Sequence, residues 1–284
     1  LGEPHVSYQN STSRELRYAH RSNNAWILET IDSTSSGEKF YYDSAIALDQ
    51  SGQPRLAYFK HGRLVYAERT AGAWQRTTVD TAGWFEFHIS LALDQADHPH
   101  ISYYNHNGGD LKYAHWDGNA WSTQTVDSAS WLGEYNSLAI DSLGRPHISY
   151  LDYTNSRLKY THFDGTTWII EDLAVAHWFG GFTSLALDPS DRPRISFADG
   201  DQQASLALWD GVSWTYQDFA SNIWYTSLAL EPGGAVQIVY YSWGPRAVQH
   251  SRWDGSNWDT QKIAVISQVG HYNALHMDSS AAAH

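Results

Sequence analysis

Short runs of alternating apolar and polar residues follow one another along the chain, separated by Gly, Pro, Asp and Asn. In residues 90–94 (Ser-Leu-Ala-Leu-Asp), the leucines fall on one face of an extended strand and the small side chains on the other. Ile101 and Tyr103 repeat this alternation in the next run. No stretch has the period of an amphipathic helix. The pattern predicts an all-β fold.

The runs form a repeat. Residues 90–94 return as closely similar strings at three later places and, in weaker form, near each end of the chain. The copies are residues 45–49, 137–141, 184–188, 227–231 and 274–278. One tryptophan per copy closes the turn between the third and fourth predicted strands. These are Trp26, Trp74, Trp121, Trp168, Trp214 and Trp258. Six copies of four antiparallel strands predict a six-bladed β-propeller, with a linear β-solenoid as the alternative.

The two ends of the chain divide one copy of the repeat between them. Residues 4–8 match the second strand of a copy, and the missing first strand occurs at residues 274–278. A ring in which the C-terminal strand completes the N-terminal blade leaves no open sheet edge, whereas a solenoid gives no reason for the split. We therefore expect one β-propeller domain of four-stranded blades over residues 1–278. Residues 279–284 resemble a linker and tag remnant.

Composition restricts the classes of function. The chain has 31 acidic and 18 basic residues and a formal net charge of −13, which argues against a nucleic-acid partner. No apolar run approaches the roughly 18 residues that span a bilayer, so we expect no membrane insertion. The absence of cysteine excludes disulfide scaffolds, thiol catalysis and cysteine-ligated metals. No signal peptide stands at Leu1, which fits a mature chain or an artificial start, and we expect a secreted or extracellular location of bacterial type.

An acidic residue ends the first predicted strand of every copy. These residues are Asp49, Asp94, Asp141, Asp188, Glu231 and Asp278. A carboxylate at this point accepts hydrogen bonds from the backbone of the following turn. It could also pair with the residue across the hairpin. Those partners are His5, Arg55, His100, His147, Arg194 and Gln237. Six carboxylates around an axis could instead hold a hard cation, but no calcium-loop spacing and no tight histidine triad occurs in the sequence. We expect no metal and no cofactor.

The copies differ most in two sets of loops, where function in a repeat protein is expected. One set leads into the first strand and the other joins the second and third strands, and a propeller places both at one mouth of its channel. Aromatic residues stand there beside acids and amides, which suits sugar recognition, because a ring covers the C–H face of a pyranose while polar groups bind its hydroxyls. The candidate ligand-binding residues are Trp84, Trp131, Trp178, Trp224, Tyr42, Tyr104, Asp152, Tyr153, Asp199 and Trp243.

The aromatic residue two positions before the first predicted strand of several copies has an alternative interpretation. Such residues could form the top layer of the core instead of a binding surface. They are Tyr135, Phe182, Tyr225 and Tyr272.

The stretch from Pro99 to Thr125 resembles the blades of six-bladed fucose-binding lectins. Both run from an apolar-Tyr strand through a polar strand into Trp-Asp-Gly-x-x-Trp, here residues 116–121. The chain is also similar to propeller repeats of secreted bacterial proteins. The resemblance implies the propeller architecture. It does not extend to fucose specificity, because the lectins clamp the sugar with an Arg on the second strand and a Glu on the third. Here Ile or Ser falls at the first position, and Tyr113, Tyr160 or Leu206 at the second.

Three classes of function remain. The leading hypothesis is a secreted, non-catalytic, lectin-like propeller that binds carbohydrate or another small ligand. The alternative is an enzyme, such as a polysaccharide lyase or glycosidase, with acid and base residues at the channel mouth. The candidates for those roles are Glu86, Glu134, His88, His106 and Tyr135. A protein-interaction scaffold is the third hypothesis.

Overall fold

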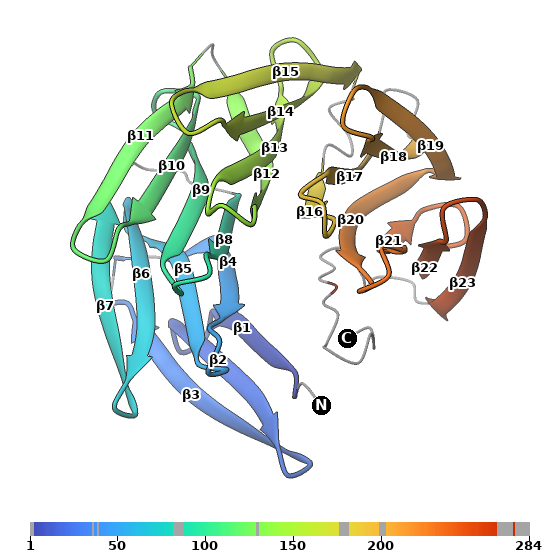
Figure 1. Cartoon of the computed structure of the whole chain (residues 1–284). Helices are drawn as coiled ribbons and strands as arrows, with labels where there is room; N and C mark the ends of the chain where they lie inside the picture. Colours follow the sequence, from blue (N-terminus) through green and yellow to red (C-terminus); the bar gives the residue numbers. More distant parts are fainter. Residues whose placement is uncertain are drawn as a thin grey trace. The chain divides into compact units, whose positions relative to one another are not determined.

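The computed structural model describes residues 3–35, 37–38, 40–81, 88–128, 131–175, 182–198, 203–265 and 275. These residues form 23 strands and no helix (Figure 1). The strands assemble into six antiparallel sheets, the first with three strands and the others with four. The all-β prediction and its six repeats are confirmed. Among the described residues there is also no helix long and apolar enough to cross a membrane.

We label the sheets A to F in chain order. Sheet A contains β1 (His5–Asn10), β2 (Glu15–Ser22) and β3 (Ala25–Ser33). Sheet B contains β4 (Phe40–Leu48), β5 (Pro54–Lys60), β6 (Arg63–Thr70) and β7 (Ala73–Asp80). Sheet C contains β8 (Ile89–Leu93), β9 (Pro99–Asn105), β10 (Asp110–Trp116) and β11 (Trp121–Asp127).

The remaining three sheets repeat this order. Sheet D contains β12 (Leu132–Ile140), β13 (Pro146–Asp152), β14 (Arg157–Phe163) and β15 (Trp168–Val175). Sheet E contains β16 (Ser184–Leu187), β17 (Pro193–Ala198), β18 (Gln203–Trp209) and β19 (Trp214–Ser221). Sheet F contains β20 (Ile223–Leu230), β21 (Val236–Ser242), β22 (Ala247–Trp253) and β23 (Trp258–Val265).

The chain consists of two compact units, Gly2–Glu134 and Tyr135–His284. The first contains sheets A to C, and the second contains sheets D to F apart from the first residues of β12. Within the first unit β4 contacts both β1 and β8, and within the second β16 contacts both β13 and β20. Neighbouring sheets of a unit therefore meet through their first and second strands. The single domain expected over residues 1–278 stays a prediction, and residues 279–284 lie outside the described part.

A serine on the first strand of one sheet binds the backbone of the next first strand. Ser137 Oγ accepts the Leu185 N–H at 3.0 Å, and Ser184 Oγ accepts the Leu228 N–H at 2.9 Å. Ser227 Oγ accepts the N–H of Leu275 in the same way at 2.9 Å. Leu275 therefore has the position of a first strand beside sheet F. The rest of residues 274–278 lies outside the described part, so closure of the ring onto sheet A stays a prediction.

The turn between the third and fourth strands follows from its sequence. In sheet C, Asp117 Oδ1 accepts the N–H groups of Asn119 and Ala120, both at 2.8 Å. Gly118 between them has φ +95°, in the left-handed region that favours glycine. Equivalent bonds to Asp164, Asp210 and Asp254 occur in sheets D, E and F. The turn fixes where the following tryptophan begins its strand.

That tryptophan packs on an aromatic ring of the preceding sheet. Trp74 lies 5.5 Å from Tyr18, and Trp121 lies 5.2 Å from Tyr66, measured between ring centroids. Trp214 and Trp258 make the same kind of contact in the second unit. These rings belong to the apolar clusters between neighbouring sheets, so these four tryptophans join sheets. Trp26 differs, because 51% of its surface is exposed.

Candidate functional site

Each sheet has two distinct ends. The hairpin end carries the turn between the first and second strands and the turn between the third and fourth strands. The loop end carries the connection between the second and third strands and the segment that leads into the first strand. These terms describe each sheet within its own unit.

At the hairpin end, the carboxylate after the first strand holds the turn together. Asp94 Oδ1 accepts the N–H groups of Ala96 and His98, at 2.8 and 2.9 Å. Asp141 Oδ1 accepts those of Leu143 and Arg145, at 2.9 and 2.7 Å. The predicted role of this acidic residue in the turn is confirmed.

In sheets B, E and F an arginine on the second or third strand pairs with this carboxylate. Arg55 Nη2 lies 2.8 Å from Asp49 Oδ2, and Arg194 Nη2 lies 2.7 Å from Asp188 Oδ2. In sheet F, Glu231 accepts the Arg252 Nε–H at 2.6 Å and a short hydrogen bond from Gln237. The predicted pairing across the hairpin is therefore confirmed in these sheets. Arg252 comes from the third strand and is a partner in addition to the predicted Gln237.

Sheets C and D place two imidazoles beside the carboxylate, and in sheet D the turn residue Arg145 also pairs with it, Nε lying 2.6 Å from Asp141 Oδ2. His100 lies opposite His115, and His147 lies opposite His162, in the register of the second and third strands. The ring centroids are 4.2 and 5.5 Å apart. Burial lowers the pKa of both His100 and His147 to about 4, so both rings are neutral at pH 7.

A tyrosine of the third strand orients each inner imidazole. Tyr113 Oη lies 2.5 Å from His100 Nδ1, and Tyr160 Oη lies 2.6 Å from His147 Nδ1. The opposite nitrogen then faces the carboxylate, with Nε2 3.7 Å from Asp94 Oδ2 in sheet C and 3.5 Å from Asp141 Oδ2 in sheet D. Both distances exceed those of a hydrogen bond.

At the loop end of the first unit, four predicted residues come together. Trp131 is 55% exposed and its ring lies 6.1 Å from that of His106. His106 is exposed and lies 5.9 Å from Tyr104, which is itself only 1% exposed. Burial, reinforced by the charge of Glu134, raises the pKa of Tyr104 to about 12. Burial also raises the pKa of the Glu134 carboxyl. We call Tyr104, His106, Trp131 and Glu134 the Trp131 cluster.

The backbone around Gly133 fixes this cluster. The Leu132 N–H donates to the Gly109 carbonyl at 2.9 Å, which brings the start of β12 against the loop after β9. Gly133 has φ +97°, and a Cβ there would lie 2.8 Å from the Leu111 Cα. Only glycine fits so close to another backbone. Leu132 is fully buried by this approach, whereas Trp131 before it is exposed.

Two predicted tryptophans lie together at the loop end of sheet F. The rings of Trp224 and Trp243 are 4.9 Å apart at 79°, and Trp243 is 39% exposed. The Trp243 N–H donates to the Asn222 carbonyl at 2.8 Å, which ties the two loops. Tyr241 lies 5.4 Å from Trp243 on the other side. This pair is a second aromatic surface, within the second unit.

Asp152 and Tyr153 have local structural partners. Asp152 is buried, and its two oxygens accept the backbone N–H and the side-chain amide of Asn155, at 2.9 and 2.8 Å. Tyr153 packs at the edge of the apolar cluster around Leu158. A binding role for either residue stays a prediction.

The aromatic residues before the first strands pack on one another in the second unit. Phe182 lies 4.1 Å from Tyr135 and 4.0 Å from Tyr225. Tyr135 and Tyr225 have φ of 52° and 56°, a conformation that costs free energy for a bulky residue and is kept where packing dictates it. The contacts agree with the alternative in which these rings form the top layer of the core.

His88 is the corresponding residue of sheet C, two positions before the string at residues 90–94. Its backbone N–H donates to Asp43 Oδ2 at 2.5 Å, and burial lowers the pKa of its ring to about 3. A neutral imidazole with so low a pKa is a poor proton donor or acceptor near neutral pH. The other predicted positions Trp84, Glu86, Trp178 and Asp199 lie outside the described residues, as does the side chain of Tyr42.

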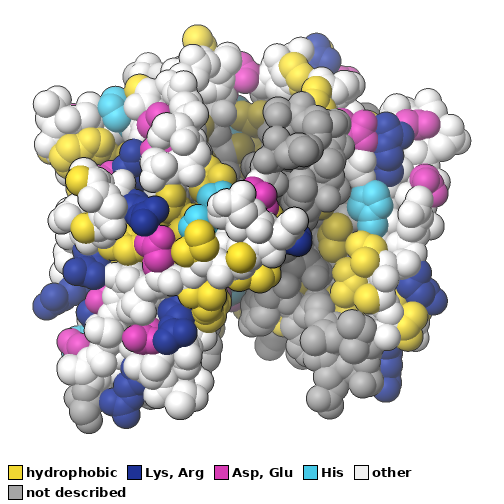
Figure 2. Space-filling view, turned by 90° about the horizontal axis from the view of Figure 1, so that it is seen from below, with side chains coloured by type: hydrophobic (Ala, Val, Ile, Leu, Met, Phe, Trp, Pro, Cys, Tyr) yellow, Lys and Arg dark blue, Asp and Glu magenta, His cyan; other side chains and the backbone are white. Residues whose placement is uncertain are grey.

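Two clefts between neighbouring sheets were not predicted. One of about 390 Å³ lies between sheets A and B, and Asp32, Lys60 and Arg76 are among its walls. Another of about 440 Å³ lies between sheets E and F and includes Arg192, Trp209 and Glu231. Opposite charges mix in both. On the face shown in Figure 2, described basic side chains likewise lie beside acidic ones.

Comparison with known proteins gives no match among protein families or curated sequences. Solved structures do match. A mutant of the Aleuria aurantia lectin AAL in complex with Fucα1-6GlcNAc has a TM-score of 0.64 at 15% identity, covering 94% of each chain. AofleA from Arthrobotrys oligospora has a TM-score of 0.59 at 15% identity, covering 87% of this chain and 80% of its own.

The chain has the fold of a six-bladed β-propeller. The lectin SapL1, solved in complex with α-methyl fucoside, agrees, with a TM-score of 0.57 at 15% identity over 94% of this chain and 97% of its own. The predicted fold class and the resemblance to fucose lectins are confirmed at the level of the fold.

Proposed function

We propose that this propeller is a secreted, lectin-like protein that binds carbohydrate through the aromatic residues of its loop ends. The observation that carries the proposal is the exposed indole of Trp131, set beside the imidazole of His106, with the Glu134 carboxyl close enough to act on Tyr104. The sugars bound by the structurally similar lectins AAL and SapL1 support a saccharide as the ligand class.

The chemistry of the Trp131 cluster suits a pyranose ring. An indole face covers the C–H surface of the sugar, and polar groups at its edge bind the hydroxyls. His106 can donate or accept a hydrogen bond, and Glu134 offers two oxygens. The Trp224–Trp243 pair offers a second apolar face in the other unit.

The proposed sugar binding does not use the Arg–Glu clamp of the fucose lectins. Ile101 and Ser102, at the place of the clamping Arg, are fully buried. Tyr113, at the place of the Glu, is buried against His100. Because these positions are used inside the sheet, stacking on the loop-end tryptophans is the recognition mode that the described residues support.

A glycan array followed by titration calorimetry tests the proposal. We expect W131A to weaken binding of the best glycan roughly tenfold or more, since one stacked aromatic contact contributes about 1.5 kcal/mol. W243A tests the second surface in the same way. W26A is the control, because Trp26 is similarly exposed but lies at the hairpin end of sheet A. Absence of any binding at millimolar sugar, or an equal loss in W26A, contradicts the proposal.

The second candidate function is that of an enzyme, and one observation favours it. Burial raises the pKa of Glu134, as a general acid for glycoside cleavage or lyase chemistry requires. If the propeller cleaves the glycan that it binds, E134Q abolishes turnover and leaves the affinity within a few fold. Turnover that survives in E134Q eliminates Glu134 as the acid.

A further inference from the structure

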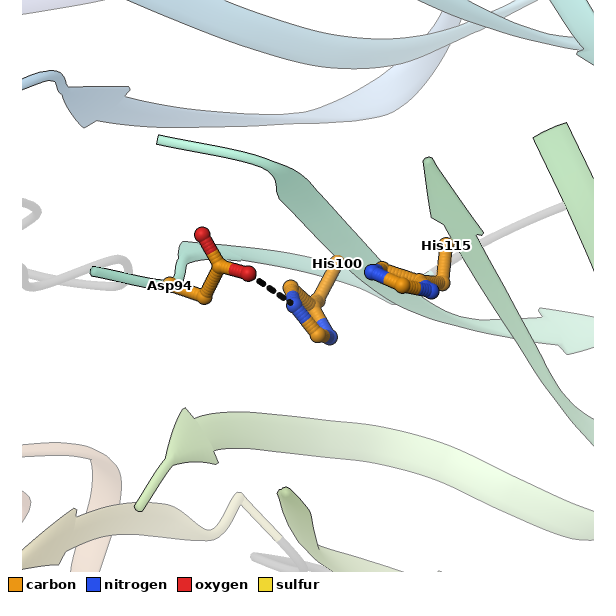
Figure 3. A group of neighbouring side chains, drawn as sticks. All are labelled: Asp94, His100 and His115. Atoms are coloured by element: carbon orange, nitrogen blue, oxygen red, sulfur yellow. Dashed lines mark ion pairs between the residues drawn. The ribbon is translucent and has the colours of Figure 1, made fainter. Parts of the chain in front are cut away.

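Sheet C brings three metal-binding side chains to one point (Figure 3). Asp94 follows β8, His100 lies on β9 and His115 lies on β10, so each of three adjacent strands contributes one residue. One ligand atom from each residue lies within 4.8 Å of the other two. Ligand atoms that share one Zn²⁺ at about 2.1 Å are roughly 3.4 Å apart, so small side-chain rotations would close the group.

The inner imidazole has an unpartnered nitrogen directed into this group. His100 is only 2% exposed, and its Nε2 is buried without a hydrogen-bond partner. A buried polar atom left in this way costs free energy, and a bound cation would remove that cost. On the other side of the ring, the hydroxyl of Tyr113 holds Nδ1 at 2.5 Å. Metal-binding histidines are oriented by such a hydrogen bond to the second nitrogen.

The carboxylate is available on the same side. Asp94 Oδ1 is used by the turn, whereas Oδ2 lies near two imidazoles, with His98 Nδ1 at 3.4 Å and His100 Nε2 at 3.7 Å. His98 lies at the partly exposed rim and can supply a fourth ligand or leave that position to water.

Sheet D has the same three residue types and shows how such a group can be blocked to a metal ion. Asp141, His147 and His162 occupy the corresponding positions. There the turn residue is Arg145, whose Nε lies 2.6 Å from Asp141 Oδ2. The guanidinium occupies the oxygen that a metal ion would need and brings a positive charge to the same place.

We propose that Asp94, His100 and His115 form a binding site for a divalent transition-metal ion, Zn²⁺ by preference, with His98 at its open side. One carboxylate oxygen and two or three imidazole nitrogens suit Zn²⁺, Co²⁺ or Ni²⁺ better than Ca²⁺ or Mg²⁺. The site is at the hairpin end, so it is independent of the loop-end tryptophans and of the proposed sugar binding.

The test uses the whole chain, stripped with a chelator and titrated with ZnCl₂ by calorimetry. We expect saturable binding that D94N and H100Q each weaken about 100-fold or more. H98R, which copies the turn of sheet D, should weaken it as strongly. H147Q is the matched control, since it removes the equivalent histidine of sheet D and should leave the Zn²⁺ affinity within a factor of two.

Spectroscopy separates loss of ligands from loss of fold. Co²⁺ added to the stripped protein should give visible d–d bands typical of a four-coordinate site, which disappear in H100Q while circular dichroism shows an intact β fold. Zn²⁺ binding that D94N, H100Q and H98R leave unchanged, or binding that H147Q removes equally, overturns the proposal.

Discussion

Sheets C and D contain the same carboxylate, the same pair of histidines and the same orienting tyrosine, yet their turns differ. Where sheet C has His98, sheet D has Arg145, whose guanidinium pairs with Asp141 at 2.6 Å. In sheet C the nearest groups to Asp94 Oδ2 are imidazoles, at 3.4 and 3.7 Å. The strands of the two sheets are equivalent, so a single residue of an exposed turn decides whether the carboxylate is paired or available.

Sheets B, E and F extend this comparison. There an arginine on the second or third strand reaches the carboxylate, as Arg55, Arg194 and Arg252 do. The carboxylate keeps its position after the first strand, whereas the arginine lies on the second strand in sheets B and E and on the third in sheet F. A repeat can therefore keep its turn geometry while its side chains exchange a structural ion pair for a group with ligand chemistry.

The largest difference between sheets C and D should appear on removing the negative charge. D141N deprives Arg145 of its partner at a buried position, and we expect it to lower the free energy of unfolding by about 2–3 kcal/mol. D94N keeps the turn hydrogen bonds and breaks no ion pair with an arginine, so its cost should stay below about 1 kcal/mol. Urea unfolding in the presence of a chelator measures both. Equal losses would show that Arg145 does not set the two sheets apart.

A smaller effect should appear as the pH falls. Burial lowers the folded-state pKa of His147 to about 4, whereas an unfolded chain binds that proton near pH 6.5. The unfolded state therefore binds more protons between these values, and stability decreases as the pH falls from about 6.5 toward 4. At pH 5.5 this loss is about 1 kcal/mol.

H147Q should remove that part of the pH dependence. Glutamine is tolerated by the fold at this position, since Gln237 occupies it in sheet F. Thermal melts of wild type and H147Q in chelator at pH 7 and pH 5.5 give the comparison. Parallel changes in melting temperature would mean that His147 does not carry the predicted linkage.

The hairpin end could largely be predicted because its partners are close in sequence. Asp49 and Arg55 flank one short turn, so their pairing follows from strand direction alone. The third ligand of the metal group, His115, comes from the next strand. A signal was present, since His100 and His115 are separated by 15 residues, as are His147 and His162. It becomes a contact only with the register of the second and third strands.

The loop end could be predicted less well because strand alternation fails there. Tyr103 and Tyr104 point to opposite faces of β9, yet both are buried. Asp152 is likewise buried by its own loop. Trp131 lies two residues before the close approach at Gly133, a tertiary contact that no local pattern encodes.

The bond from a first-strand serine to the leucine amide of the following first strand joins each copy to its successor through one hydroxyl. Every copy with this serine and leucine contains both the acceptor and the donor. An in-frame duplication of a whole copy would therefore bring its own connections, whereas a duplication of part of a copy would leave one of them unmatched. This bond thus favours lengthening of the architecture by whole repeats.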